Sequence, residues 1–190
     1  MTTVHPIEAE SYRRMRGTVD LAGLPPLSRA VTERVVHASA DVDYAGDLVL
    51  DEDALQRGLA ALDAGRPVVV DVAMVAAGIT AVATSCGLGA AEPPPGQTRS
   101  AAGIRAAVAQ AGPGGVYVVG CAPTALFALL EADADPALVV GLPVGFVGAV
   151  EAKQALRDSG LPAVSNRGPK GGSAVAAAAL NALLYAGGRR

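Results

Sequence analysis

Short runs of β-branched residues alternate with longer runs rich in alanine and leucine, and this alternation limits the possible folds more than any other feature of the chain. Strands buried on both faces of a parallel sheet are nearly free of charge, and helices cover them. The runs predicted as strands lie at residues 67–72, 80–85, 116–120, 137–142 and 161–165. The runs predicted as the connecting helices lie at residues 52–64, 99–111, 124–132, 147–159 and 174–186.

This pattern predicts an α/β fold, a three-layer α/β/α arrangement whose mostly parallel central sheet has about five strands. Residues 7–17 and 26–39 are predicted as two leading helices that precede the first strand. Asp51 and Ser173 are expected to act as N-caps of the helices that follow them. The chain has 190 residues and no long linker, so we expect a single domain that spans residues 1–190.

The composition argues against several classes of protein. Apolar residues make up 51% of the chain, charged residues 17%, and the net charge is −3, so disorder is excluded and the basic surplus of a nucleic-acid-binding protein is absent. Aromatic residues make up only 3%, which leaves no stacking platform for bases. We therefore expect a globular protein that binds no nucleic acid.

One charge-free stretch, residues 72–91, is long enough to cross a bilayer. Glycines interrupt it and its flanks are the acidic Asp71 and Glu92, so we interpret it as a buried core segment and expect no membrane association. The N-terminal residues lack a signal-peptide pattern. Cys86 and Cys121 have no metal-ligand spacing and suit reduced thiols, so a cytoplasmic location is expected.

The histidines are the first candidates for chemistry. His5 suits a surface or capping role, whereas His37 ends the helix predicted at 26–39 and lies three residues after Arg34, on the same helix face. On spacing alone, a C-terminal histidine stabilised by the helix dipole is the simpler interpretation. The functional interpretation is a proton-transfer residue beside an anion-binding arginine, because free histidine titrates near pH 6.5.

A glycine-rich loop with two cations is the second candidate. The sequence NRGPKGGS at residues 166–173 places Arg167 and Lys170 before a predicted helix, which favours carboxylate or phosphate binding slightly over a plain tight turn. Arg99 also precedes a helix, although a solvated arginine is the more common case. Asp71 at a strand end suits either a ligand group or an N-cap. The glycine motifs of nucleotide-binding loops, metal-ligand clusters and hydrolase triads are all missing.

Longer segments of the sequence are similar to those of a known family. The chain resembles precorrin-8X methylmutase in four ordered blocks and in its first predicted helix, HPIEAESYRRMR (5–16). The blocks are RVVHASADVDYAGDL (34–48), ALQRGLAALDAGRPVVVDVAMVAAGI (54–79), GLPVGFVGAVEAKQAL (141–156) and NRGPKGGSAVAAAALNALL (166–184). The resemblance covers nearly the whole chain.

The resemblance implies an isomerase that moves a methyl group from C-11 to C-12 of a corrinoid ring, in the cobalt-free or the cobalt-containing route of cobalamin biosynthesis. It implies that His37 donates and accepts the proton and that Ser11 and Arg34 bind substrate. From their charge and position, Arg99, Arg167 and Lys170 are expected to bind the substrate's carboxylates.

The resemblance also implies the setting of this site. We expect no cofactor and no metal, a homodimer with the pocket near the subunit interface, and possible hand-over of the product to the next enzyme of the pathway. Pro169 and Ala73 depart from the family pattern, and each would weaken contacts to carboxylates. A non-catalytic corrinoid carrier is the main alternative, and a nucleotide-binding protein is a weaker one.

Overall fold

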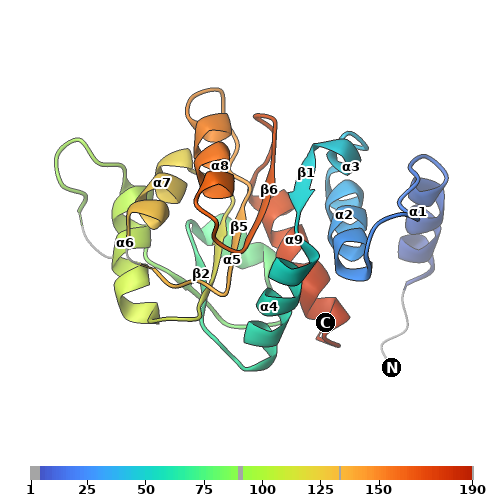
Figure 1. Ribbon diagram of the computed structural model, residues 1–190, viewed down its shortest axis with the longest axis horizontal. Coiled ribbons are helices and arrows are strands. Elements are labelled where there is room, and N and C mark those ends of the chain that lie inside the picture. Colours follow the sequence, from blue (N-terminus) through green and yellow to red (C-terminus); the bar gives the residue numbers. More distant parts are fainter. Residues whose placement is uncertain (1–4, 90–91, 133, 190) are drawn as a thin grey trace.

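The computed structural model describes residues 5–89, 92–132 and 134–189, which form a three-layer α/β/α structure (Figure 1). Within these residues the sheet has six strands in the order β1-β6-β5-β4-β2-β3. All neighbouring strands are parallel except β1, which is antiparallel to β6. The strands are β1 (Leu48–Leu50), β2 (Val68–Val70), β3 (Thr84–Cys86), β4 (Val116–Val119), β5 (Leu138–Gly141) and β6 (Ala163–Asn166). The predicted fold class is confirmed.

Two groups of helices cover the two faces of the sheet. Helices α4, α5 and α9 pack on one face against Val68 and Val70, with α2 (Pro26–Ser39) outside them on α9, and α6, α7 and α8 pack on the other face against Val69. The helices after α2 are α3 (Tyr44–Asp47), α4 (Glu52–Asp63), α5 (Ala73–Gly78), α6 (Arg99–Ala111), α7 (Pro123–Glu131), α8 (Ala149–Asp158) and α9 (Ser173–Ala186). None of the helices in the described ranges is long and apolar enough to cross a membrane.

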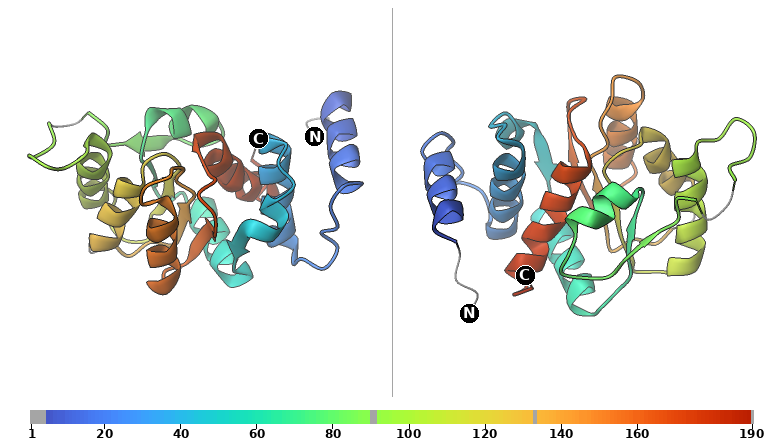
Figure 2. Two further views of the ribbon diagram at one scale, coloured as in Figure 1. Left: turned by 90° about the horizontal axis from the view of Figure 1, so that it is seen from above. Right: turned by 180° about the vertical axis from the view of Figure 1, so that it is seen from behind.

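The two leading helices differ in how firmly they are packed. Helix α2 (Pro26–Ser39) lies along α9 and buries Val31 and Val35 completely. Helix α1 (Pro6–Arg16) packs on α2 at the outside of the molecule and buries none of its residues (Figure 2). Met15 is the partly buried apolar residue of α1 that packs against the core, and the helix is otherwise attached by polar contacts with α2 such as those of Ser11 with His37 and Arg16 with Glu33.

Most predicted elements end within two residues of the observed bounds, and the exceptions are short. Strand β1 was not predicted because its apolar run is cut off on both sides by Asp47 and Asp51, and helices α3 and α5 were not predicted because each is under two turns long, too short to show a helical period. The strand predicted at 80–85 is wrong in its position, since β3 begins only at Thr84. The buried segment predicted at 72–91 is also wrong for residues 72–89, of which only Val75 and Ile79 are buried; residues 90 and 91 lie outside the described residues.

The two predicted helix caps had different outcomes. Asp51 caps α4 by accepting a hydrogen bond from the amide of Ala54 at 2.8 Å. Ser173 is instead the first residue of α9, and Gly172 takes the capping position with φ 123°. A glycine is needed before Ser173 because the backbone there adopts a conformation that side chains disfavour.

The carboxyl ends of the parallel strands and the end of α2 lie at one edge of the sheet. Parallel pairing brings together the turns that follow β2, β4, β5 and β6. Strand β1 runs the opposite way and pairs Leu48 with Asn166, so α3 and the last turn of α2 lie beside the end of β6, at the upper edge in Figure 1. Open α/β sheets bind their ligands at this edge.

Asp71 joins two of these strand ends. It is only 1% exposed, and its carboxylate accepts hydrogen bonds from the backbone amides of Gly120, Cys121 and Ala122 at 3.1, 2.8 and 3.1 Å. It does not cap α5, whose N-cap is Val72. Asp71 therefore holds the turn between β4 and α7, which is a structural role.

We expect Asp71→Ala to lower the free energy of unfolding by about 2–4 kcal/mol, because backbone amides would be left without an acceptor in the interior. Urea denaturation followed by circular dichroism measures this change. Asp71→Asn keeps one acceptor oxygen and should lose less. Equal stability of the wild type and Asp71→Ala would contradict the structural role.

Candidate active site

His37 is held by two neighbouring residues of α1. It lies half-buried in the last turn of α2, and its Nδ1 atom is 3.2 Å from the hydroxyl oxygen of Ser11. The ring of Tyr12 stacks on the imidazole with the two centroids 4.4 Å apart and the planes only 5° from parallel. A histidine held in this way can present its other nitrogen, Nε2, to a ligand.

Arg34 lies one turn before His37 and is held from two sides. Its Nη1 atom donates to Glu8 and to the hydroxyl of Tyr12, both at 3.1 Å, and its Nη2 atom donates to the hydroxyl of Tyr185 at 3.3 Å. The guanidinium also lies over the ring of Tyr185, 4.7 Å from its centroid. The structure thus brings together the predicted site residues Ser11, Arg34 and His37.

The loop after β6 is tied to the turn after α2. Lys170 donates to the carboxylates of Asp41 and Asp43 at 2.7 and 2.8 Å. These hydrogen bonds raise the pKa of Lys170, and the bond from Lys170 lowers the pKa of Asp41. The charge of Lys170 is therefore balanced within the chain, and the loop that carries it lies next to the turn that begins three residues after His37.

The other two predicted arginines form no hydrogen bond with Ser11, Arg34 or His37 in the described residues. Arg167 is exposed, and its guanidinium donates to the carbonyl oxygen of Gly46 at 3.0 Å. Arg99 is the exposed first residue of α6, which lies at the opposite end of the molecule from α1 and α2 in Figures 1 and 2. One chain therefore does not bring Arg99 to His37.

The loops after β5 and β6 contact each other closely. The amide of Gly172 donates to Leu142, and the amide of Gly145 donates to the carbonyl oxygen of Pro169 at 3.2 Å. A Cβ atom on Gly171 would lie 2.3 Å from the carbonyl oxygen of Leu142, so only glycine allows this approach. Pro169 thus takes part in the loop contact through its backbone.

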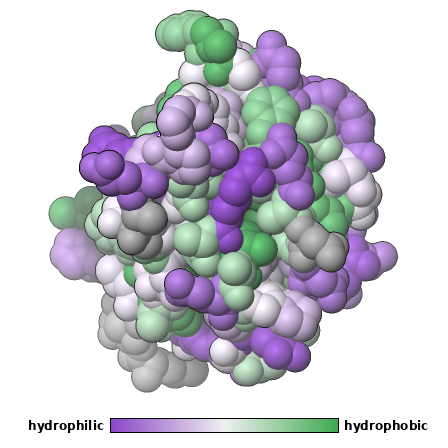
Figure 3. All heavy atoms as spheres, turned by 90° about the vertical axis from the view of Figure 1, so that its left-hand side faces the viewer, coloured by the Kyte–Doolittle hydropathy of each residue, from purple (hydrophilic) through white to green (hydrophobic). Residues whose placement is uncertain are grey.

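An exposed apolar tip follows β5 at the same edge of the sheet. Val144, Phe146 and Val147 are 46%, 102% and 88% exposed. Figure 3 shows apolar side chains that protrude at the top of the molecule. Residues 142–148 reach the same upper edge in Figure 1. Apolar surface beside cationic loops suits a ligand that has both an apolar ring and anionic substituents.

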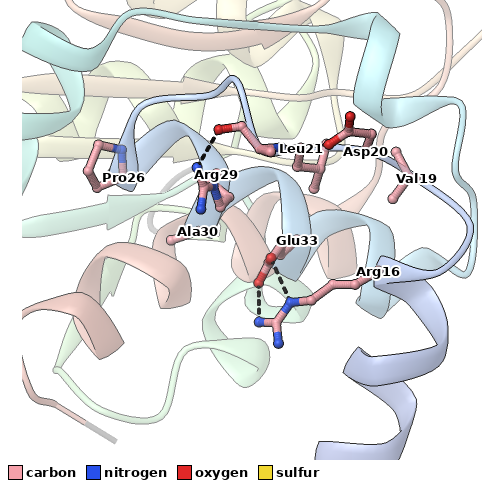
Figure 4. Close-up of a pocket in the computed structure, with 9 residues that line it drawn as sticks. Arg16, Val19, Asp20, Leu21, Pro26, Arg29, Ala30 and Glu33 are labelled. Atoms are coloured by element: carbon pink, nitrogen blue, oxygen red, sulfur yellow. Dashed lines mark hydrogen bonds and ion pairs between the residues drawn. The ribbon is translucent and has the colours of Figure 1, made fainter.

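A cavity of about 420 Å³ lies away from this edge, between the first turns of α2 and residues 19–22 (Figure 4). Its polar side chains bind one another or the backbone: Arg16 pairs with Glu33 at 2.7 Å, and Arg29 donates to the carbonyl oxygen of Ala22 at 2.7 Å. His37 does not line it. We therefore place the candidate site in the cluster around His37 and not in this cavity.

No group of three or more histidine, cysteine, aspartate or glutamate side chains is arranged to hold a metal ion within the described ranges. Cys86 and Cys121 are free thiols. Burial and the nearby carboxylate of Asp71 raise the pKa of Cys121, which disfavours its reactive thiolate form.

A family model described as precorrin-8X methylmutase matches residues 6–186. The chain belongs to the precorrin-8X methylmutase family. It is 44% identical to a precorrin-8X methylmutase of Pseudomonas aeruginosa, covering 93% of each chain, and 42% identical to a cobalt-precorrin-8 methylmutase of Salmonella typhimurium, covering 94% of this chain and 93% of the relative. The precorrin-8X methylmutase structure from Thermus thermophilus matches with a TM-score of 0.85 and 36% identity over 95% of each chain.

Membership of the precorrin-8X methylmutase family identifies the chain as an enzyme of the isomerase class with a role in cobalamin biosynthesis.

Three side chains that support the site were not predicted from the sequence: Tyr12, Tyr185 and Lys153. Tyrosines number only four in the chain, and Tyr12 directly follows Ser11, which was a usable signal. Lys153 lies among the buried positions of α8, with Ala149, Ala152 and Leu156, so it interrupts an apolar helix face.

Lys153 is fully buried and organises the loop after β6. Its ammonium donates to the side-chain oxygen of Asn166 at 2.9 Å, to the carbonyl oxygen of Lys170 at 2.8 Å, and to the carbonyl oxygen of Gly168. On the other side of the loop, Asp47 accepts hydrogen bonds from the Asn166 side chain and from the amide of Gly168 at 2.6 and 2.8 Å. Burial lowers the pKa of Lys153 to about 8, although the charge of Asp47 opposes the shift.

The depressed pKa of Lys153 predicts a stability that rises with pH. Between about pH 8 and the ordinary lysine value of 10.5, the unfolded chain binds the proton that the folded chain has lost. The free energy of unfolding should therefore increase over this window, by at most about 1.4 kcal/mol per pH unit. Urea denaturation at several pH values measures the slope, and subtracting the slope of Lys153→Met removes the contribution of other groups. Equal slopes would contradict the prediction.

Proposed function

We propose that the chain moves a methyl group from C-11 to C-12 of precorrin-8X or cobalt-precorrin-8, with His37 as the proton donor and acceptor. The observation that carries this proposal is the imidazole of His37 held by Ser11 one turn from Arg34. The relatives from Pseudomonas aeruginosa and Salmonella typhimurium are named for the cobalt-free and cobalt-containing substrates, respectively. Both substrates therefore belong to the proposal.

In the proposed reaction, the two ring nitrogens of His37 have separate tasks. In the charged imidazole, the Nδ1 proton is donated to the Ser11 oxygen, 3.2 Å away, while Nε2 gives its proton to a carbon of the conjugated ring system. Protonation rearranges the double bonds, the methyl group migrates across one face from C-11 to C-12, and loss of a proton completes the isomerisation. Substrate and product then contain the same atoms, so no cofactor is consumed.

The substrate's acetate and propionate side chains would be bound by the cations at the carboxyl edge. Arg34 offers a guanidinium next to the acid, and Arg167 offers an exposed one on the loop after β6. Lys170 would have to share its charge with Asp41 and Asp43. Alanine at position 73 offers no side-chain hydrogen bond at the end of β2, so fewer polar contacts are expected there.

A homodimer would explain the position of Arg99. Because Arg99 begins a helix at the far end of the chain from His37, it can contribute to the same substrate only if a second copy supplies it. The exposed apolar tip at 142–148 offers surface for such an assembly. The proposal includes a cytoplasmic enzyme with reduced thiols that passes its product to the next enzyme of the pathway.

The role of His37 predicts that His37→Ala loses turnover. The rate should fall by about 10²–10⁴-fold, the usual contribution of a general acid–base residue. Conversion of precorrin-8X to hydrogenobyrinate is followed by visible absorption, a range in which unmodified amino-acid side chains do not absorb. His5→Ala, at the other histidine, is the matched control and should keep the wild-type rate. If the wild type binds the corrinoid without converting it, the carrier function is correct instead.

Ser11→Ala tests the support of His37 separately. Removing one hydrogen bond from the imidazole should lower kcat about tenfold, less than loss of the histidine itself. The same absorption assay measures this change. A kcat equal to that of the wild type would show that Ser11 does not hold the acid.

The shared site predicts complementation between inactive variants. His37→Ala and Arg99→Ala, refolded together, form mixed dimers in which one of the two sites has both native residues. In a random mixture the activity should recover to roughly a quarter of the wild-type value, as two-fold symmetry requires. Sedimentation velocity measures the dimer itself. A monomeric protein, or a mixture no more active than its components, would contradict a site shared between subunits.

A further inference from the structure

Tyr12 contacts both of the side chains to which the proposed reaction assigns the main tasks. Its ring stacks on the imidazole of His37 at 4.4 Å, and its hydroxyl oxygen accepts a hydrogen bond from Nη1 of Arg34 at 3.1 Å. The guanidinium of Arg16 lies over the same ring, 5.6 Å from its centroid. Tyr12 therefore links an acid, an anion-binding arginine and the end of its own helix.

Stacking supplies a restraint that the hydrogen bond of Ser11 cannot supply alone. One hydrogen bond fixes the place of Nδ1 but leaves the imidazole free to rotate about that contact. A parallel ring 4.4 Å away fixes the plane of the imidazole, and the two restraints together determine where Nε2 points. Catalysis is sensitive to such orientation, because small misplacements of a reacting group cost much of the rate.

The hydroxyl of Tyr12 acts on a different residue. The guanidinium of Arg34 is held between Tyr12 on one helix and Tyr185 on another, with Glu8 as its charged partner. A phenol oxygen accepts one N–H of the guanidinium and leaves other N–H groups for a ligand carboxylate. The hydroxyl therefore determines the position of Arg34 without neutralising its charge.

We propose that Tyr12 is a positioning residue with two separable effects: its ring orients His37 for proton transfer, and its hydroxyl places Arg34 for substrate binding. This inference rests on the proposed function. It explains why α1, which buries none of its residues, carries two adjacent side chains that both touch His37.

The separation of the two effects is tested with Tyr12→Phe and Tyr12→Leu in the full chain. Phe keeps the stacked ring and removes the hydroxyl, so kcat should stay within about twofold of the wild type while KM rises about fivefold, the size of one typical hydrogen bond. Leu removes both, so kcat should also fall about tenfold or more. Arg13→Ala, an exposed position on the same helix, is the control and should change neither constant.

A substrate-free measurement reports the stack directly. The chain has only two histidines, so the Cε1 proton of His37 is resolved by NMR against that of His5. A proton held over an aromatic ring resonates upfield. The His37 signal should be upfield in the wild type and in Tyr12→Phe, and should move to an ordinary position in Tyr12→Leu, while the signal of His5 stays unchanged.

The proposal is supported if Tyr12→Phe keeps the wild-type kcat and the upfield His37 signal while Tyr12→Leu loses both. It is overturned if Tyr12→Leu keeps the wild-type kcat, or if Tyr12→Phe loses as much kcat as Tyr12→Leu. Failure of the proposed function has a different result: wild-type protein with the upfield His37 signal and no turnover. That result would remove the catalytic role of Tyr12 together with the reaction, while the stack itself would still be observed.

Discussion

The buried ammonium of Lys153 organises the edge of the sheet on which the proposed site depends. Its three acceptors all belong to the segment from Asn166 to Lys170, so this loop folds around one charge. The same loop then contacts the turn after β5 through backbone hydrogen bonds and the turn after α2 through Asp41 and Asp43. A lysine removed from water is costly unless its hydrogen bonds are satisfied, which makes the loop conformation and the buried charge mutually dependent.

The site itself combines a firmly packed helix with a loosely packed one. His37 and Arg34 belong to α2, whose Val31 and Val35 are completely buried, whereas Ser11 and Tyr12 belong to α1, which has no fully buried residue. Segments with few buried apolar contacts open most readily. The position of His37 is therefore set by the core, while its orientation depends on polar and aromatic contacts with an outer helix.

Much of the fold was predictable because the central strands are nearly charge-free apolar runs and the predicted helices have nine residues or more. The buried strands and the amphipathic helices show clear patterns, and their bounds agree with the structure within two residues. Strand β1, which is bounded by Asp47 and Asp51, and the short helices α3 and α5 were not predictable, because their neighbours and not a pattern of their own stabilise them. The misplaced strand at 80–85 and the surface position of α5 have the same origin, since an apolar run alone does not reveal which residues the core will cover.

The sequence by itself determined the fold class, the pairing of Arg34 with His37 on one helix face, and the resemblance that identifies the family, because all of these depend on local spacing or on ordered motifs. Tertiary structure alone decided that Ser11 and Tyr12 contact His37 from 26 and 25 residues away, that Lys153 is buried, that Asp71 is structural, and that Arg99 lies far from His37. These contacts join residues distant in sequence, and their geometry arises only when helices pack and parallel strands align their ends at one edge.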